Sequence, residues 1–138
     1  HCVGGLVSDP VKRSGWVFAL DEIHNHECVG SMFYGDTISS RADPKKNVAL
    51  TAEYLLWDIM TQMECPTGHA LMPAPFTEAL RAPSLDEICE VQLWAREIEK
   101  IARGIHPHFN FDASRRFAGE ICEKGRTIFH EALDFLAV

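Results

Sequence analysis

The segment "DEIHNHEC", residues 21–28, concentrates acidic, histidine and cysteine side chains directly after the apolar run "GWVFAL". If this segment is extended, His24 and His26 point to the same side, and Glu22 shares that side. Zinc and other transition metals need three or four ligands of this kind. Two other interpretations stay open, namely a polar rim that faces a substrate or cofactor, and a solvated loop. The sequence thus offers Glu22, His24 and His26 as a hypothetical metal site.

A second group of candidates follows the run "CVGSMFY", where Asp36 and Thr37 come after Gly35. Glycine lets a ligand or another backbone come close at this point. The alternative is a turn in which Asp36 caps the local backbone. His69 begins the apolar segment "HALM". It is either satisfied by a nearby carbonyl group, or it lies at the mouth of a cleft, where it binds a cofactor or moves protons.

Composition and motif content exclude several classes of function. The formal net charge is −7 and no cluster of Lys and Arg exceeds two residues, so neither nucleic acid nor an anionic membrane surface is expected as a partner. No stretch approaches the roughly 20 apolar residues that span a bilayer, and no signal peptide is recognisable. No GxGxxG, Walker A, GxSxG or HExxH motif occurs. We expect a cytoplasmic protein whose five cysteines are reduced.

Apolar patterns predict the elements that would position these candidates. Unbroken apolar runs followed by polar side chains predict short buried strands, and apolar residues at every third or fourth position predict amphipathic helices. The expected strands are residues 14–20, part of 28–40, and 69–72, and the expected helices are residues 44–64, 84–105 and 113–136.

Capping residues support the helix boundaries. Asp43 is expected as an N-cap, with Pro44 at the first helical position, where its missing N–H costs nothing. Ser84 and Glu87 have the spacing of a capping box, and Asp112 is placed to cap the last helix. The expected apolar faces are Val48, Ala52, Leu55, Ile59 and Met63 in the first helix, and Phe117, Ile121, Ile128, Ala132 and Phe135 in the last.

The order of elements, strand, strand, helix, strand, helix, helix, favours an α/β fold. We expect residues 1–83 to form the α/β part. Residues 84–138 would add an antiparallel pair of helices, joined by the connector "HPHFNF".

Residues 27–83 resemble the later barrel part of the large subunit in the cobalamin- and pyridoxal-phosphate-dependent lysine 5,6-aminomutase and ornithine 4,5-aminomutase family. The resemblance is carried by "CVGSMFYGDTIS", by the helical stretch "VALTAEYLLWDIMTQM" and by "PTGHALMP". It implies a TIM-type barrel whose strand ends meet the corrin ring, and a radical 1,2-shift of an amino group on an amino acid. It also implies that Asp36, Thr37 and His69 lie at that ligand-facing end.

The chain is therefore expected to be part of a cobalamin-dependent mutase. A complete eightfold barrel takes about 250 residues, so three strands would be the last strands of a partial TIM-like barrel, followed by two C-terminal helices. The start at His1 agrees with a fragment. The expected partners are the remainder of the barrel or a second subunit, a cobalamin-binding domain and a small-molecule substrate. The expected catalytic residues are Asp36, His69 and Glu22, and the expected cofactor-binding residues are Thr37, Tyr34 and His26.

Two alternatives stay open. Zinc held by His24, His26 and Glu22 would support a corrinoid-linked methyl transfer or a hydrolysis. A non-catalytic subunit would instead use its amphipathic helices to complete a partner's fold. Pyridoxal phosphate is a second cofactor implied by the family, but no lysine follows an expected strand, so a Schiff-base lysine is not expected in this chain.

Overall fold

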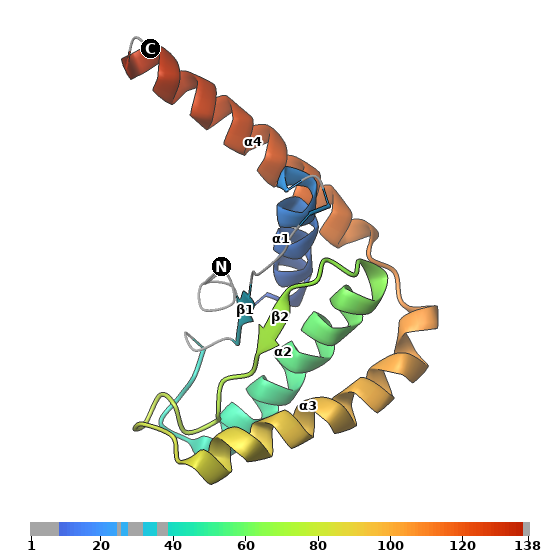
Figure 1. Ribbon diagram of the computed structural model, residues 1–138, viewed down its shortest axis with the longest axis vertical. Helices are drawn as coiled ribbons and strands as arrows, with labels where there is room; N and C mark the ends of the chain where they lie inside the picture. The colour runs from blue at the N-terminus through green and yellow to red at the C-terminus, as the bar shows by residue number, and fades with distance from the viewer. Residues whose placement is uncertain (1–8, 25, 28–31, 36–38, 137–138) are drawn as a thin grey trace.

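The structure, a computed structural model, describes residues 9–24, 26–27, 32–35 and 39–136. These residues are mostly helical and carry one small parallel sheet (Figure 1). In chain order the elements are α1 (Pro10–Ile23), β1 (Met32–Tyr34), α2 (Pro44–Glu64), β2 (Ala70–Met72), α3 (Leu85–Ile105), a short 3-10 helix (His106–His108) and α4 (Asp112–Leu136).

The first expected strand, residues 14–20, is wrong, because this stretch lies inside helix α1. The Asp9 side chain caps the helix by accepting a hydrogen bond from the Lys12 N–H, and Pro10 occupies its first turn. All but one of the residues from Arg13 to Asp21 are buried. A helix buried on most sides has no polar face to reveal its period, and a short apolar run then looks the same as a buried strand.

The other two strand predictions hold over three residues each, and the two strands form a parallel pair. Met32 lies opposite Ala70, and Tyr34 opposite Met72. Parallel strands need a long crossover connection, and α2 provides it. The result is a β1–α2–β2 unit, which is the repeating element of α/β folds. In the described part of the chain the sheet has these two strands and does not close into a barrel.

The two faces of the sheet differ in what covers them. Phe33 is buried against Val17 and Leu20 of α1, and Leu71 packs against buried residues of both α1 and α2. On the opposite face Tyr34 and Met72 are 38% and 40% exposed. Both helices therefore cover the Phe33 face, and the Tyr34 face is open.

The three long helices that the sequence predicts are confirmed. The Asp43 side chain accepts a hydrogen bond from the Lys45 N–H at the start of α2. Both bonds of the capping box between Ser84 and Glu87 are present at the start of α3. Helix α4 differs slightly, because Asp112 is its first residue and the Asn110 side chain accepts the Asp112 N–H at 2.6 Å. Asp112 is thus the first helical residue and not the N-cap.

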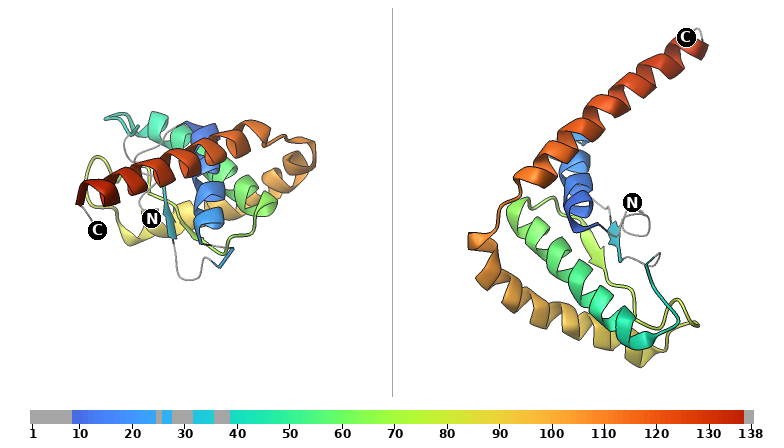
Figure 2. Two further views of the ribbon diagram at one scale, coloured as in Figure 1. Left: turned by 90° about the horizontal axis from the view of Figure 1, so that it is seen from above. Right: turned by 180° about the vertical axis from the view of Figure 1, so that it is seen from behind.

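The last two helices do not form the expected antiparallel pair. Helix α3 packs on α2, while α4 packs on α1, and Figures 1 and 2 show α3 and α4 leading away from their connector in different directions. Helices α1 and α4 run the same way, since an added Cβ on Gly15 would meet Ser114 while Glu22 pairs with Arg126. Helix α4 thus packs with its buried residues against α1 and not against α3, the helix that precedes it in the sequence.

Candidate functional site

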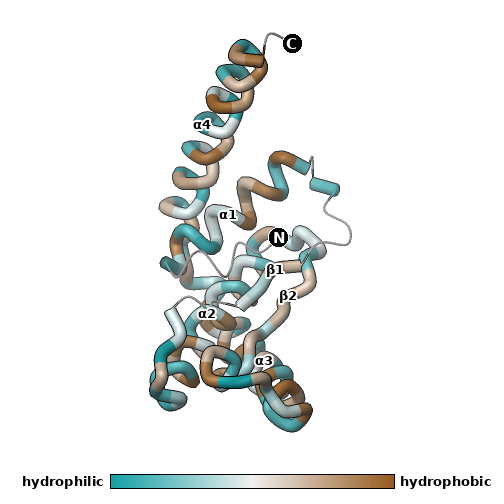
Figure 3. Tube along the Cα trace, turned by 90° about the vertical axis from the view of Figure 1, so that its left-hand side faces the viewer, coloured by the Kyte–Doolittle hydropathy of each residue, from teal (hydrophilic) through white to brown (hydrophobic). Residues whose placement is uncertain are grey.

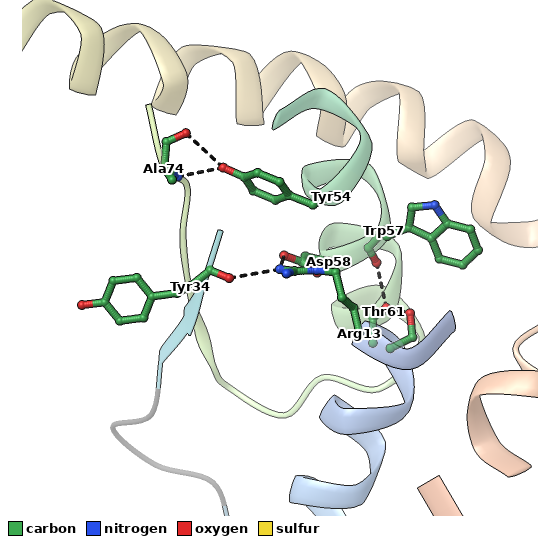
Figure 4. Close-up of polar contacts among 8 residues, drawn as sticks. Arg13, Tyr34, Tyr54, Trp57, Asp58, Thr61 and Ala74 are labelled. Carbon is green, nitrogen blue, oxygen red and sulfur yellow. Dashed lines mark hydrogen bonds and ion pairs between the residues drawn. The ribbon is translucent and has the colours of Figure 1, made fainter. Parts of the chain in front are cut away.

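The centre of the fold holds an ion pair between α1 and α2. The Nε of Arg13 donates to Oδ1 of Asp58 at 3.0 Å, and a second guanidinium nitrogen donates to Oδ2 of the same carboxylate. That nitrogen also donates to the backbone carbonyl of Tyr34 at 3.1 Å (Figure 4). Arg13 has no exposed surface and Asp58 is 4% exposed. The pair thus fixes the carboxyl end of β1 to both helices.

Aromatic rings complete the surroundings of this guanidinium. Its carbon lies 5.4 Å from the centre of the Phe33 ring and 5.2 Å from that of Tyr54. Such cation–π contacts are strongest where water is excluded. Arg13 is therefore held by a carboxylate, a carbonyl and two ring faces at once.

Tyr54 ties the segment after β2 to α2. Its hydroxyl donates to the Ala74 carbonyl at 3.0 Å and accepts from the Ala74 N–H at 2.8 Å (Figure 4). Burial raises the pKa of Tyr54 to about 12, so the phenol stays neutral. A Cβ on Gly35 would lie 2.5 Å from the Tyr54 hydroxyl oxygen. Glycine is thus required at the carboxyl end of β1 because another chain segment comes so close.

This polar core was not predicted from the sequence. The expected face of α2 included Val48 and Ala52, but both are exposed, and the buried face is rotated towards Asn47, Thr51, Tyr54, Asp58 and Thr61. These polar groups have partners in α1 and in the loops around α2. The Ser14 and Thr61 hydroxyls lie 2.7 Å apart, beside the Arg13–Asp58 pair, and Asn47 donates to the Phe76 carbonyl. The signal that could have found them is Asp58 itself, a charged residue beside Leu55 and Ile59 on an otherwise apolar face.

The segment "DEIHNHEC" is not extended, which corrects the geometry behind the metal hypothesis. Glu22 is in the last turn of α1, His24 is the residue that ends the helix, and His26 has a left-handed backbone with φ 62°. The Glu22 carboxylate pairs with Arg126 of α4 at 3.1 Å. Among the described residues, no three His, Cys, Asp or Glu side chains are placed to hold a metal ion. Cys28 lies outside those residues.

A different cluster forms there instead, around the Asp21 carboxylate. One oxygen, Oδ2, accepts from the His26 ring nitrogen Nδ1 at 2.5 Å and from the Cys65 thiol at 3.4 Å. A hollow of about 330 Å³ lies beside them, lined also by Phe18 and Arg115. Burial and the Asp21 carboxylate raise the pKa of Cys65 to about 11. The thiol is therefore a neutral hydrogen-bond donor and not a thiolate nucleophile.

His69 lies at the amino end of β2, one residue before Ala70. Its Nδ1 is hydrogen-bonded to the Thr67 hydroxyl, and its ring packs edge-on against Phe33. Burial lowers the pKa of His69, so the ring is neutral at neutral pH. His69 thus lies at the amino end of the parallel pair, whereas Tyr34 and Gly35 lie at its carboxyl end. Asp36 and Thr37 lie outside the described residues, so their expected place beside His69 stays a prediction.

The candidate residues thus fall at two ends of the sheet. Glu22 lies at the end of α1, His24 and His26 lie between α1 and β1, and His69 directly precedes β2. Tyr34 is at the carboxyl end, where its side chain is partly exposed. Asp36 and Thr37 lie outside the described residues.

Comparison with known proteins gives no match: neither a family model, a curated protein nor a solved structure is similar to this chain. None of the described helices is long and apolar enough to cross a membrane. Among the described cysteines, Cys65, Cys89 and Cys122 form no disulfide. What defines the class of the chain is therefore its own architecture, a helical protein built around one parallel β–α–β unit.

Proposed function

We propose that this chain forms part of a β/α barrel in a cobalamin-dependent mutase, with the open face of its sheet turned towards the barrel interior. The observation that carries the proposal is the asymmetry of the β1–α2–β2 unit. Both helices cover the Phe33 and Leu71 face, and the Tyr34 and Met72 face is open. In a TIM barrel every helix lies outside and the inner face is filled by side chains of other strands.

The carboxyl end of this unit is the place for a ligand. Active sites of β/α barrels lie at the carboxyl ends of the strands. Tyr34 and Met72 lie opposite each other at that end, and they present an aromatic and a thioether surface that suits a flat, largely apolar ring such as a corrin. Asp36 and Thr37 follow Gly35 directly in the sequence. We propose that these polar side chains orient the substrate and that Thr37 and Tyr34 contact the cofactor.

Residues at the amino end have a different role in this proposal. In β/α barrels the residues at the amino ends of the strands contribute to stability of the fold. In this proposal Glu22, His26 and His69 therefore take no part in catalysis or cofactor binding. When bound, cobalamin supplies the radical that starts a 1,2-shift, which side chains cannot generate themselves. The protein then binds, orients and excludes water. The Arg13–Asp58 pair contributes by fixing the Tyr34 carbonyl, two residues before Asp36.

The test is an absorption titration with adenosylcobalamin of the full assembly that contains this chain, followed by gel filtration of the mixture. We expect a change in the corrin spectrum and co-elution. Tyr34→Ala should weaken binding about tenfold, while the matched control His26→Ala, at the other end of the sheet, should leave it unchanged. An unaltered spectrum without co-elution, or equal effects of the two variants, would refute the proposal.

The open sheet face also favours a second candidate, a non-catalytic subunit that completes a partner's fold. This candidate predicts that Asp36→Ala leaves the activity of an assembled complex intact. Loss of activity without loss of assembly excludes it. The zinc alternative has no comparable support, because Glu22 is paired with Arg126 and His26 with Asp21.

A further inference from the structure

The outer half of α4 carries an uncovered apolar surface among the described residues. Helix α1 covers the first half, where Ser114, Ala118 and Cys122 are buried. Beyond Arg126 the helix continues alone to Leu136, as Figures 1 and 3 show. Four large apolar side chains on this part are 61% to 88% exposed: Ile128, Phe129, Phe135 and Leu136. A contiguous patch of this kind marks an interaction surface, and a short helix without tertiary contacts is only marginally stable in water.

The apolar positions on this half have a seam with alternating spacings of three and four residues. Gly125, Ile128, Ala132 and Phe135 continue the spacing of Ser114, Ala118 and Ile121. In the first half Ser114 and Ala118 are buried and Ile121 packs against the core. A repeat averaging 3.5 residues is the pattern of helices that pack side by side. The uncovered half is therefore built to receive another helix.

We propose that the occupant is the same half of α4 from a second copy of this chain, packed antiparallel. In a two-fold pair centred at the level of residue 130, Gly125 faces Phe135 and Ile128 faces Ala132. Every layer then sets a small residue against a large one, which is how well-packed cores are filled. A parallel pair would set each residue against itself, leaving voids at Gly125 and crowding at Phe135. The seam is thus self-complementary in one orientation only, as a two-fold interface requires.

A hollow in the surface lies beside Gly125, where the antiparallel pair would place the Phe135 ring of the second copy. Its volume is about 500 Å³, and Ile23, Cys122, Gly125 and Phe129 contribute to its lining. In the antiparallel pair the Phe135 ring of the second copy ends beside Gly125. Ile23 of α1 is 58% exposed next to this hollow and would be covered at the same time. This inference is independent of the proposed cobalamin chemistry.

The first test compares two glycine variants by sedimentation velocity, from micromolar to near-millimolar concentration. At both Gly125 and Gly119 an added Cβ meets nothing within 4 Å, so neither substitution strains the monomer. We expect a concentration-dependent dimer that Gly125→Leu weakens at least about tenfold by filling the hollow. Gly119→Leu, off the seam, should leave it unchanged. A chain that is monomeric throughout, or equal effects of the two variants, would overturn the proposal and indicate a different occupant.

The second test determines the orientation by cross-linking. Glu131 flanks the seam next to the two-fold axis, so in an antiparallel pair it lies beside its own counterpart, whereas Ile128 does so only in a parallel pair. Glu131→Cys should form a disulfide-linked dimer under mild oxidation, identified by mass spectrometry of the linked peptide, and Ile128→Cys should not. The opposite result would contradict the antiparallel arrangement. Because two Glu131 carboxylates repel each other in this pair, we also expect dimerisation to tighten with ionic strength.

Discussion

Arg13 and Asp58, separated by 45 residues in the sequence, form an ion pair that is buried between α1 and α2. The same guanidinium holds the last carbonyl of β1. One side chain therefore connects two helices and the sheet. Removing either partner leaves a charge without its counterion in the interior, which costs far more than the pair itself contributes.

We expect Asp58→Ala to lower the free energy of unfolding by about 3–5 kcal/mol, measured by urea denaturation. The double variant Arg13→Met, Asp58→Leu should lose much less, because no charge is left uncompensated. Glu97→Ala, which breaks an exposed pair with Lys100, is the control and should change little. Equal losses for Asp58→Ala and for the control would show that the buried pair is not formed.

Gly35→Ala and Gly119→Ala should change stability in opposite directions. At Gly35 the new methyl group would meet the Tyr54 hydroxyl and the Ala74 backbone nitrogen, and overpacking of this kind costs about 1–3 kcal/mol. At Gly119 the helix is open, and alanine in a helix interior gains about 1 kcal/mol over glycine. Thermal unfolding of both variants gives the sign directly. A stabilised Gly35→Ala would mean that Tyr54 does not approach this strand end.

Tyr54 should ionise late and should control stability at high pH. Its pKa is raised from 10.0 to about 12 by burial, so the folded protein binds this proton more tightly than the unfolded chain does. The resulting stability is complete below pH 10 and is lost as pH rises towards 12. A pH titration of tyrosinate absorbance should show one late step that Tyr54→Phe removes. The same variant should lower the free energy of unfolding by about 1–3 kcal/mol, because the buried Ala74 N–H loses its hydrogen-bond acceptor. An early, single-step titration would contradict the burial of this phenol.

Cys65 should react slowly with iodoacetamide at mildly alkaline pH, because its pKa of about 11 keeps the thiol protonated and the thiolate is the nucleophile. Cys89 is exposed and serves as the internal comparison in peptide mass spectrometry. Asp21→Asn removes the carboxylate that contributes to the raised pKa, so Cys65 should then react faster. If Cys65 is the faster of the two thiols, or if Asp21→Asn slows it, the contact between Cys65 and Asp21 is not as described.

The elements that sequence patterns predicted correctly are those whose signals are local. The capping residues Asp43 and Ser84 and the three-and-four spacing of α3 are contained within a few turns of chain, and the structure confirms both helices. Residues 70–72 are likewise short, apolar and bounded by Gly68 and Pro73, and they form β2. Each of these signals needs no knowledge of a distant partner.

The failures all depend on partners far away in the sequence. The predicted strand over residues 14–20 is wrong because the polar residues of α1 are buried as well as its apolar ones. Arg13 and Ser14, for example, are buried against α2. The backbone course of "DEIHNHEC" cannot be predicted from its own residues, because nothing within it shows that α1 continues to Ile23. The position of His69 relative to Tyr34 depends on the parallel register of β1 and β2, which no pattern within residues 69–72 shows. The polar core around Tyr54 needs the β1–β2 pairing before its neighbours can be named.

The parallel packing of α1 on α4 determines the order in which this molecule can fold. The Cys122 sulfur lies next to the Ala19 carbonyl across 103 residues of sequence. Closing so long a loop is slow, because its entropy is lost before the contact forms. During synthesis α1 emerges before α4, so Phe18 and Ala19, which pack with Ala118 and Cys122, stay uncovered on that side until α4 arrives. The β1–α2–β2 unit and α3 can assemble earlier. We therefore expect the docking of α4 onto α1 to be the last step of folding, and the uncovered α1 face to be aggregation-prone until then.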